Sequence, residues 1–305
     1  MKIAFWNVGI KTKKNDREIY TIDILNSIIS MINESGFDAI FLCEVDEEFN
    51  LNSSTLKIMH EHSISLVNAS ERISNRLSFD ICGIFNNKKT KLDHEEYIIY
   101  NDLDDGDEKT GNNIKIGARF KLEDITSNGE IDIIISHWPS KSTPGYSFKH
   151  KDAAERLGNE VIALLKNGKQ VILMGDYNLS PYEMINNTNL KSYNNKYYAT
   201  RSSLRMYNLS FKYYDQHSLL TDGSDNHPPM GFGTFISKNS RITEIGCEVF
   251  DQAHVSSSFI EEGPWILNEK ETKIFFNDTI TTLIYGNEKH LDHLPISLEI
   301  IKNER

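Results

Sequence analysis

Six short apolar segments recur along the 305-residue chain, and they constrain the fold more than any other feature of the sequence. Each is rich in Ile, Val, Leu or Phe and is bounded by polar residues or glycine, which is typical of strands buried in a core. They are Lys2–Val8, Ala39–Cys43, Ile81–Phe85, Ile131–Ser136, Gln170–Met174 and Cys247–Val255. Because no Pro/Gly/Ser-rich linker separates them, we expect a single domain over residues 1–305.

Segments with helical spacing of apolar residues lie between these strands. The stretch from Ile19 to Ile32 keeps a spacing near 3.6, as does Ala153–Leu165, which is followed by a typical helix stop at Gly168. Nearer the C-terminus, Gly231–Ser237 and Thr279–Tyr285 have the composition of two successive strands. Interleaved strands and helices predict an α/β layered fold with a mixed sheet.

Composition excludes several classes of protein. At 39% hydrophobic residues the chain has enough apolar surface for a core, so it is not a disordered chain. No apolar run approaches the ~20 residues of a membrane span, and three cysteines fit a reducing compartment better than a disulfide scaffold. The N-terminal apolar run is short and reads as a strand rather than a signal peptide, so we expect a cytoplasmic protein without a membrane or obligate protein partner.

The charge balance of 33 Lys+Arg against 44 Asp+Glu gives a net charge of −11. This disfavours nucleic-acid binding over the whole surface, but not an enzyme whose basic residues surround one cleft. The most acidic stretch is Asn101–Glu108. It has alternating carboxylates that could surround Ca²⁺, but it lacks the closing carboxylate of a calcium loop, which favours a solvated acidic loop.

Polar side chains that are common in active sites recur at the ends of the predicted strands. They are Asn7, Glu44, His137, Asp176 with Asn178, Asp251, and Asp292 with His293. Each alone has an ordinary explanation as a turn residue, a surface carboxylate or a structural histidine. Six such positions in succession make coincidence a poor explanation, because groups at the same end of successive strands converge on one site.

In this order the motifs resemble the endonuclease/exonuclease/phosphatase superfamily, which includes deoxyribonuclease I, AP endonucleases, sphingomyelinases and inositol polyphosphate phosphatases. The matching segments are Trp6-Asn7-Val8, Leu42-Cys43-Glu44, Ser136-His137, Gly175-Asp176-Tyr177-Asn178, Phe250-Asp251-Gln252 and Leu291-Asp292-His293-Leu294-Pro295. They run from residue 6 to residue 295, so the resemblance covers the chain. It implies a four-layered α/β sandwich in which two packed mixed β-sheets are flanked by helices. Cys43, Tyr177 and Leu291 replace the usual Gln, Phe and Ser, which we expect to shift the geometry slightly without loss of chemistry.

The resemblance implies a divalent cation, Mg²⁺ with Mn²⁺ as the alternative. Glu44 is its leading ligand, with Asp292 and Asn7 near the cation or bound to it through water. These oxygen donors suit a hard cation, and Mg²⁺ usually takes only one or two carboxylates.

The resemblance also implies roles for the remaining polar groups. Asp176 would orient or activate a water, and Asn178 would hold a phosphate oxygen. His293, oriented by Asp251, would act as a base or as a donor to the phosphate. His137 would stabilise the developing charge or protonate the leaving oxygen.

Three further residues complete the predicted site. Asp80 lies at the start of a strand and is either the partner of His137 or a solvent-facing residue.

Lysines follow two of the motifs. Lys11, Lys13 and Lys14 follow Asn7, and Lys141, Lys149 and Lys151 follow His137. They either make a local positive rim or are ordinary solvated residues. Among them Lys141 is the best candidate to contact phosphate, and Arg156, on a predicted helix, either contacts the substrate or braces a loop.

Three functions follow from these residues. The first is a metal-dependent nuclease that cleaves DNA or RNA phosphodiester bonds with an activated water, so that nucleic acid is the expected partner. The second is a phosphatase or phosphodiesterase acting on a small molecule or a lipid headgroup. The third is a non-catalytic binding module, which ranks last because the Asp, Asn and His set is complete.

Overall fold

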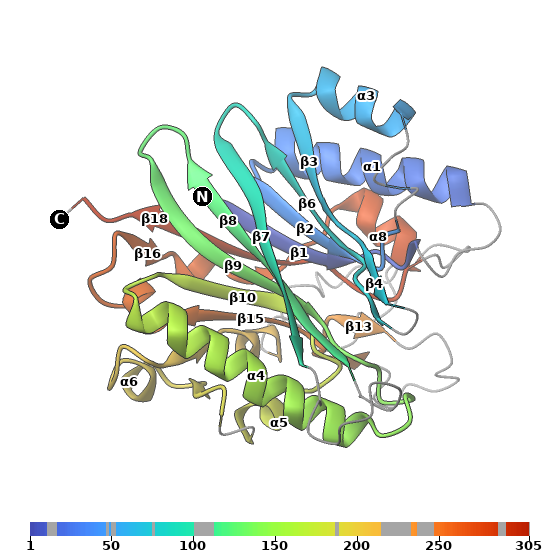
Figure 1. Ribbon diagram of the computed structural model, residues 1–305. Coiled ribbons are helices and arrows are strands. Elements are labelled where there is room, and N and C mark those ends of the chain that lie inside the picture. The colour runs from blue at the N-terminus through green and yellow to red at the C-terminus, as the bar shows by residue number, and fades with distance from the viewer. Residues whose placement is uncertain are drawn as a thin grey trace, which may run out of the picture.

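Two β-sheets pack against each other at the centre of the computed structural model (Figure 1). The first has the order β16 (Trp265–Leu267), β18 (Ile296–Lys302), β1 (Lys2–Asn7), β2 (Ala39–Cys43), β6 (Ile81–Asn86) and β3 (Ile64–Ala69), with β17 (Lys273–Ile274) also paired to β18. The second has the order β11 (Ser192–Tyr193), β12 (Met206–Asn208), β15 (Asp251–Ser256), β10 (Val171–Asp176), β9 (Gly129–His137), β8 (Ile114–Asp124) and β7 (Thr90–Tyr100). Both sheets are mixed, because β1–β2 and β9–β10 are parallel whereas β1–β18 and β10–β15 are antiparallel.

Helices cover the outer face of each sheet (Figure 1). Those on the first sheet are α1 (Arg17–Asn33), α3 (Ser53–Glu61) and α8 (Asp278–Tyr285), and the long α4 (Tyr146–Lys166) covers the second. Shorter elements are α5 (Pro181–Asn186), α6 (Lys196–Ala199), the 3₁₀ turns η2 (Ser210–Tyr214), η3 (Ser257–Phe259) and η4 (Glu269–Glu271), and the strand pairs β4 (Arg72–Ser74) with β5 (Leu77–Ser78) and β13 (Phe235–Ile236) with β14 (Cys247–Glu248).

The structure describes residues 1–10, 17–46, 49, 53–74, 77–100, 113–186, 189–214, 233–236, 247–285 and 291–304. The acidic stretch Asn101–Glu108 and the lysines Lys11, Lys13 and Lys14 lie outside these residues. Within them, no helix combines the length and the apolar character that crossing a membrane requires.

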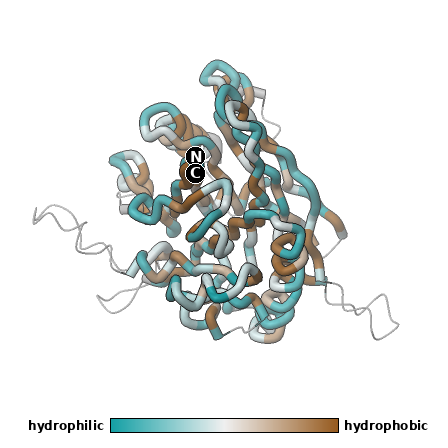
Figure 2. The backbone as a smooth tube through the Cα atoms, turned by 90° about the vertical axis from the view of Figure 1, so that its left-hand side faces the viewer, coloured by the Kyte–Doolittle hydropathy of each residue, from teal (hydrophilic) through white to brown (hydrophobic). Residues whose placement is uncertain are grey.

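Side chains alternate between the two faces of each strand, and they build two cores. In β10, Ile172 and Met174 face the core between the sheets, whereas Val171 and Leu173 pack in a second core with α4. In Figure 2 the hydrophobic stretches of the backbone concentrate in the interior. Because each sheet buries both of its faces, the helix–sheet–sheet–helix order makes four layers, and the predicted four-layered α/β sandwich is confirmed.

Two sequence-based expectations for local structure were wrong. Thr279–Tyr285 was expected to be a strand but forms most of α8, because Ile280, Leu283 and Ile284 recur at helical spacing and are buried in the main core. The run Cys247–Val255 was expected to be one strand, but it divides into β14 and β15.

Candidate active site

Three candidate residues lie in one row across the second sheet. In the ladders, Asp176 of β10 is opposite His137 of the parallel strand β9 and opposite Asp251 of the antiparallel strand β15. Close approach of β9 and β10 requires Gly175, because a Cβ there would lie 2.2 Å from the carbonyl oxygen of Ser136. The close packing of β9 and β10 therefore explains why the residue before Asp176 is a glycine.

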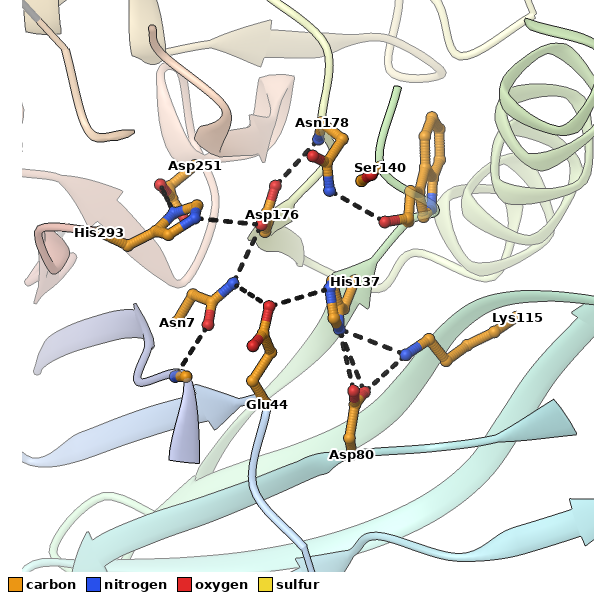
Figure 3. A network of polar contacts seen from close by, with 12 residues as sticks. Asn7, Glu44, Asp80, Lys115, His137, Ser140, Asp176, Asn178, Asp251 and His293 are labelled. Carbon is orange, nitrogen blue, oxygen red and sulfur yellow. Dashed lines mark hydrogen bonds and ion pairs between the residues drawn. The ribbon is translucent and has the colours of Figure 1, made fainter. Parts of the chain in front are cut away.

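The first sheet brings Asn7 and Glu44 to the same place (Figure 3). Asn7 ends β1 and is paired with the last residue of the parallel strand β2, which Glu44 directly follows. The Asn7 Nδ2 group donates to Glu44 Oε1 and to Asp176 Oδ2, each at 3.1 Å. This buried amide therefore links the two sheets at the site.

Two candidate residues have left-handed backbones, Glu44 with φ 57° and Asn178 with φ 52°. Such a conformation is costly for a residue with a long side chain such as glutamate, and it persists where the surrounding structure fixes it, often at ligand sites. Asn178 is fixed by two hydrogen bonds, from its backbone N–H to Asp176 Oδ1 at 2.9 Å and from its Nδ2 to the Trp138 carbonyl oxygen at 3.0 Å.

His293 is buried against two carboxylates. Its Nδ1 lies 2.8 Å from Asp251 Oδ2 and its Nε2 lies 3.7 Å from Asp176 Oδ2. Burial lowers the pKa of His293, but the charges of Asp251 and Asp176 outweigh this effect and raise the pKa to about 10. Burial raises the pKa of Asp176, although the His293 charge opposes this. The imidazolium form of His293 is therefore favoured at neutral pH.

His137 has a different environment on the other side of Asp176 (Figure 3). Its Nδ1 lies 3.1 and 3.2 Å from the two oxygens of Asp80, and its Nε2 lies 3.8 Å from Glu44 Oε1. Asp80 was predicted to be either the partner of His137 or a residue that faces solvent. It is buried and contacts His137, so the first alternative describes its position.

Sequence reasoning missed Lys115, which joins this histidine–carboxylate pair. Its Nζ donates to Asp80 Oδ1 at 2.5 Å and lies 3.3 Å from His137 Nδ1. A signal was present, because Ile114 and Ile116 face the core with α4, so the residue between them points to the opposite face of β8. A lysine on that inward face requires a buried partner.

The candidate cation ligands fall into two groups: those predicted from the sequence and those that the structure brings together. In the first group, Asp292 and Glu44 both lie on the side of the site near Tyr20, because burial and then the charges of these two carboxylates raise the pKa of its hydroxyl. In the second group, one ligand atom each from Asp176, Asp251 and His293 lies within 4.8 Å of the others. The Asp251 Oδ1 atom is buried and accepts no hydrogen bond from the described residues.

The two predicted substrate-binding cations have different positions. Lys141 Nζ pairs with Glu183 at 3.0 Å and lies 5.4 Å from the centre of the Phe250 ring, at the border of the site. Arg156 instead forms an ion pair with Glu160 within α4 at 2.6 Å and lines a separate pocket. The structure thus brings Lys141 toward the candidate site and does not bring Arg156 there.

Comparison with known proteins identifies the fold. No protein-family model matches the sequence, and no curated protein matches it. Among solved structures, Danio rerio TDP2 with a single-strand DNA product matches with TM-score 0.59 and 14% identity over 99% of each chain. An endonuclease/exonuclease/phosphatase family protein from Leptotrichia buccalis C-1013-b matches with TM-score 0.56 and 15% identity, again over 99% of each. The Bacteroides thetaiotaomicron VPI-5482 mannosyl-6-phosphatase matches with TM-score 0.54 and 13% identity, likewise over 99% of each. The predicted resemblance is confirmed at the level of the fold.

Proposed function

From this fold of the endonuclease/exonuclease/phosphatase superfamily, we propose that the protein is a metal-dependent phosphoester hydrolase whose substrates are nucleic-acid phosphodiesters. One observation carries the proposal. Two histidines lie on either side of Asp176, and each has Nδ1 against a buried carboxylate and Nε2 near a second one (Figure 3). A phosphate ester needs a water on one side of phosphorus and a proton for the leaving oxygen on the other, which such an arrangement can supply.

Glu44 and Asp292 would hold the divalent cation, since carboxylate oxygens match the preference of Mg²⁺ and the Glu44 side chain is partly exposed at 23%. Asn7 would contact the cation through water or hold Glu44 in place, because its Oδ1 accepts the Gly9 N–H and its Nδ2 donates to Glu44 Oε1. The second group fits less well, because His293 Nδ1 and Asp251 Oδ2 already contact each other at 2.8 Å, which leaves Asp251 Oδ1 as its one buried oxygen without a hydrogen bond among the described residues. When bound, the cation supplies positive charge that neutralises the phosphate oxygens.

The protein's own residues would divide the proton transfers. Asp176 would orient the attacking water through Oδ2, which also accepts from Asn7 Nδ2 and lies toward His293, while Oδ1 accepts the backbone N–H of Asn178. Its raised pKa makes this carboxylate a better base than an exposed one. The His293 imidazolium would donate to a phosphate oxygen, and His137 would present Nε2 to the leaving oxygen while Asp80 holds its Nδ1.

Two observations support nucleic acid over a small phosphate ester. Lys141 places a cation at the border of the site, where it can contact the backbone of a polyanion. The D. rerio TDP2 structure of the same fold holds a single-strand DNA product. The alternative, a phosphatase acting on a small molecule, is supported by the mannosyl-6-phosphatase among the structural neighbours.

An activity screen with Mg²⁺ or Mn²⁺ tests the proposal. The substrates are plasmid DNA, single-stranded oligonucleotides, RNA and simple phosphate esters, including sugar phosphates. The wild-type protein should cleave nucleic acid, and His137→Ala should not. His60→Ala is the matched control, because His60 is an exposed histidine in the last turn of α3 and should retain activity. Cleavage of sugar phosphates alone would favour the phosphatase, and no hydrolysis of any substrate would contradict both.

A further inference from the structure

An exposed aromatic side chain follows the candidate site residue Asn178 by four residues in the sequence. Tyr182 belongs to α5 and is 64% exposed, whereas aromatic rings usually bury most of their surface. Its ring packs edge-to-face on Phe211, with centroids 4.9 Å apart and planes at 85°, and its centroid lies 6.1 Å from that of Tyr214. Both partner rings are half-buried. They hold the Tyr182 ring in place while leaving most of it in water.

Two hydrogen bonds fix the first turn of α5. The backbone N–H of Ser180 donates to Glu183 Oε2 at 2.8 Å, and the backbone N–H of Glu183 donates to Ser180 Oγ at 3.3 Å. This reciprocal pair is a capping box. Four residues of chain span at most about 14 Å, so Tyr182 stays within reach of the groups that flank a phosphate bound at Asn178.

A continuous series of contacts also joins α5 to His293. The Lys141 ammonium pairs with Glu183 at 3.0 Å and lies 5.4 Å from the centre of the Phe250 ring. The Phe250 ring stacks on Phe235 with centroids 5.3 Å apart, and the Phe235 ring lies 4.9 Å from the His293 ring. This border of the site therefore combines a cation with aromatic rings, as grooves that bind single-stranded nucleic acid do.

We propose that Tyr182 is a stacking platform for a base of single-stranded nucleic acid, beside the phosphate that is cleaved. The proposal rests on the phosphoester hydrolase function proposed above and names its substrate class. Bases within a duplex already stack on both of their faces, so only an unpaired base can stack on the Tyr182 ring. The strand backbone would pass Lys141, whose charge favours phosphate whatever the sequence. Single strands should therefore bind more tightly than duplexes of the same length.

Binding of oligonucleotides tests this assignment separately from catalysis. Fluorescence polarisation is measured in a His137→Ala background, which is expected to prevent cleavage, with a labelled single strand and with the same strand carrying abasic sites. Tyr182→Ala should raise the Kd for the normal strand about 5- to 150-fold and leave the Kd for the abasic strand unchanged. Tyr182→Phe keeps the ring and should bind within about twofold of the parent protein.

Tyr197→Ala is the matched control, because Tyr197 is 62% exposed on α6 and contacts Tyr198 and Arg201 instead. Its Kd should equal that of the parent protein, and melting temperatures should show that each variant is folded. An unchanged Kd in Tyr182→Ala, or equal losses on normal and abasic strands, would overturn the assignment. Tyr182-dependent binding without any turnover by the wild-type protein would uphold it and overturn the proposed hydrolase function. Turnover without Tyr182-dependent binding would uphold the hydrolase function and overturn the stacking role of Tyr182.

Discussion

The pair formed by Asp251 and His293 gives the sharpest prediction for catalysis. The 2.8 Å contact is buried, and Asp251 is the main charge that raises the pKa of His293 to about 10. In Asp251→Asn the side chain keeps its shape but loses its charge, so the pKa of His293 should fall toward the ordinary value of about 6.5. The imidazolium would then be lost within the working pH range.

The size of the effect follows from the role of the group. Loss of one general acid–base group costs about 10²–10⁴-fold in rate, or about 3–5 kcal/mol in the barrier. We expect a loss of this size in turnover for His293→Ala and for Asp251→Asn, and the deficit of Asp251→Asn should deepen as the pH rises from 6 to 9. Because the two groups act as one unit, the double variant should be little worse than His293→Ala alone.

The assay is turnover per folded molecule over this pH range, with melting temperatures measured alongside. Asp132→Asn is the control, because it removes another buried carboxylate, on β9, that pairs with Arg119 and does not contact the site. Multiplicative losses in the double variant, or a deficit that does not change with pH, would refute the paired mechanism. If Asp251 only stabilises the fold, its variant would melt earlier and keep its rate per folded molecule.

Three further predictions concern positioning and stability. Lys115→Met should lower turnover about 10- to 100-fold, because Lys115 holds Asp80 and His137 together. Lys115→Arg should recover part of the loss, and Lys121→Met on the same strand should have no effect. Equal rates for Lys115→Met and the wild type would refute this role. Gly175→Ala should reduce the free energy of unfolding by at least about 1–3 kcal/mol in urea titrations, since its Cβ would meet backbone atoms of Ser136, and unchanged stability would contradict that packing. Burial lowers the pKa of His254 to about 3, so the unfolded chain binds one more proton between pH 6.5 and 3, and stability is lost as the pH falls through this range. From pH 6.5 to 5 the wild type should lose about 2 kcal/mol more than His254→Asn, and parallel losses would show that His254 is protonated in the folded state.

The sequence was informative where a candidate site residue follows a buried strand. Asn7, Glu44, His137 and Asp176 each follow an apolar run, and parallel pairing brings the ends of such runs to one edge of a sheet. Local composition is sufficient to place polar residues at these strand ends, because burial of the strand and the change to a polar residue are both visible in sequence, whereas their roles were implied only by the family resemblance.

The remaining features depend on contacts between distant parts of the chain. Lys115 and Asp80 are 35 residues apart, and only the packing of the two sheets makes them neighbours. Arg156 was predicted from its nearness in sequence to His137, but each residue of a helix turns about 100°, and α4 places this arginine at a different pocket. Thr279–Tyr285 has the β-branched residues of a strand, and burial of Ile280 and Leu283 on one face makes it a helix.

The central claim is that phosphoester hydrolysis at this site requires a divalent cation held by Glu44. The most direct test measures turnover of the best substrate from the screen against free Mg²⁺ concentration, for the wild type and for Glu44→Gln. We expect no hydrolysis in excess chelator, recovery on adding Mg²⁺ or Mn²⁺, and a half-saturating Mg²⁺ concentration at least about 10-fold higher in the variant, because an amide replaces a negatively charged ligand. Full turnover in excess chelator, or the same Mg²⁺ dependence in both proteins, would contradict the claim.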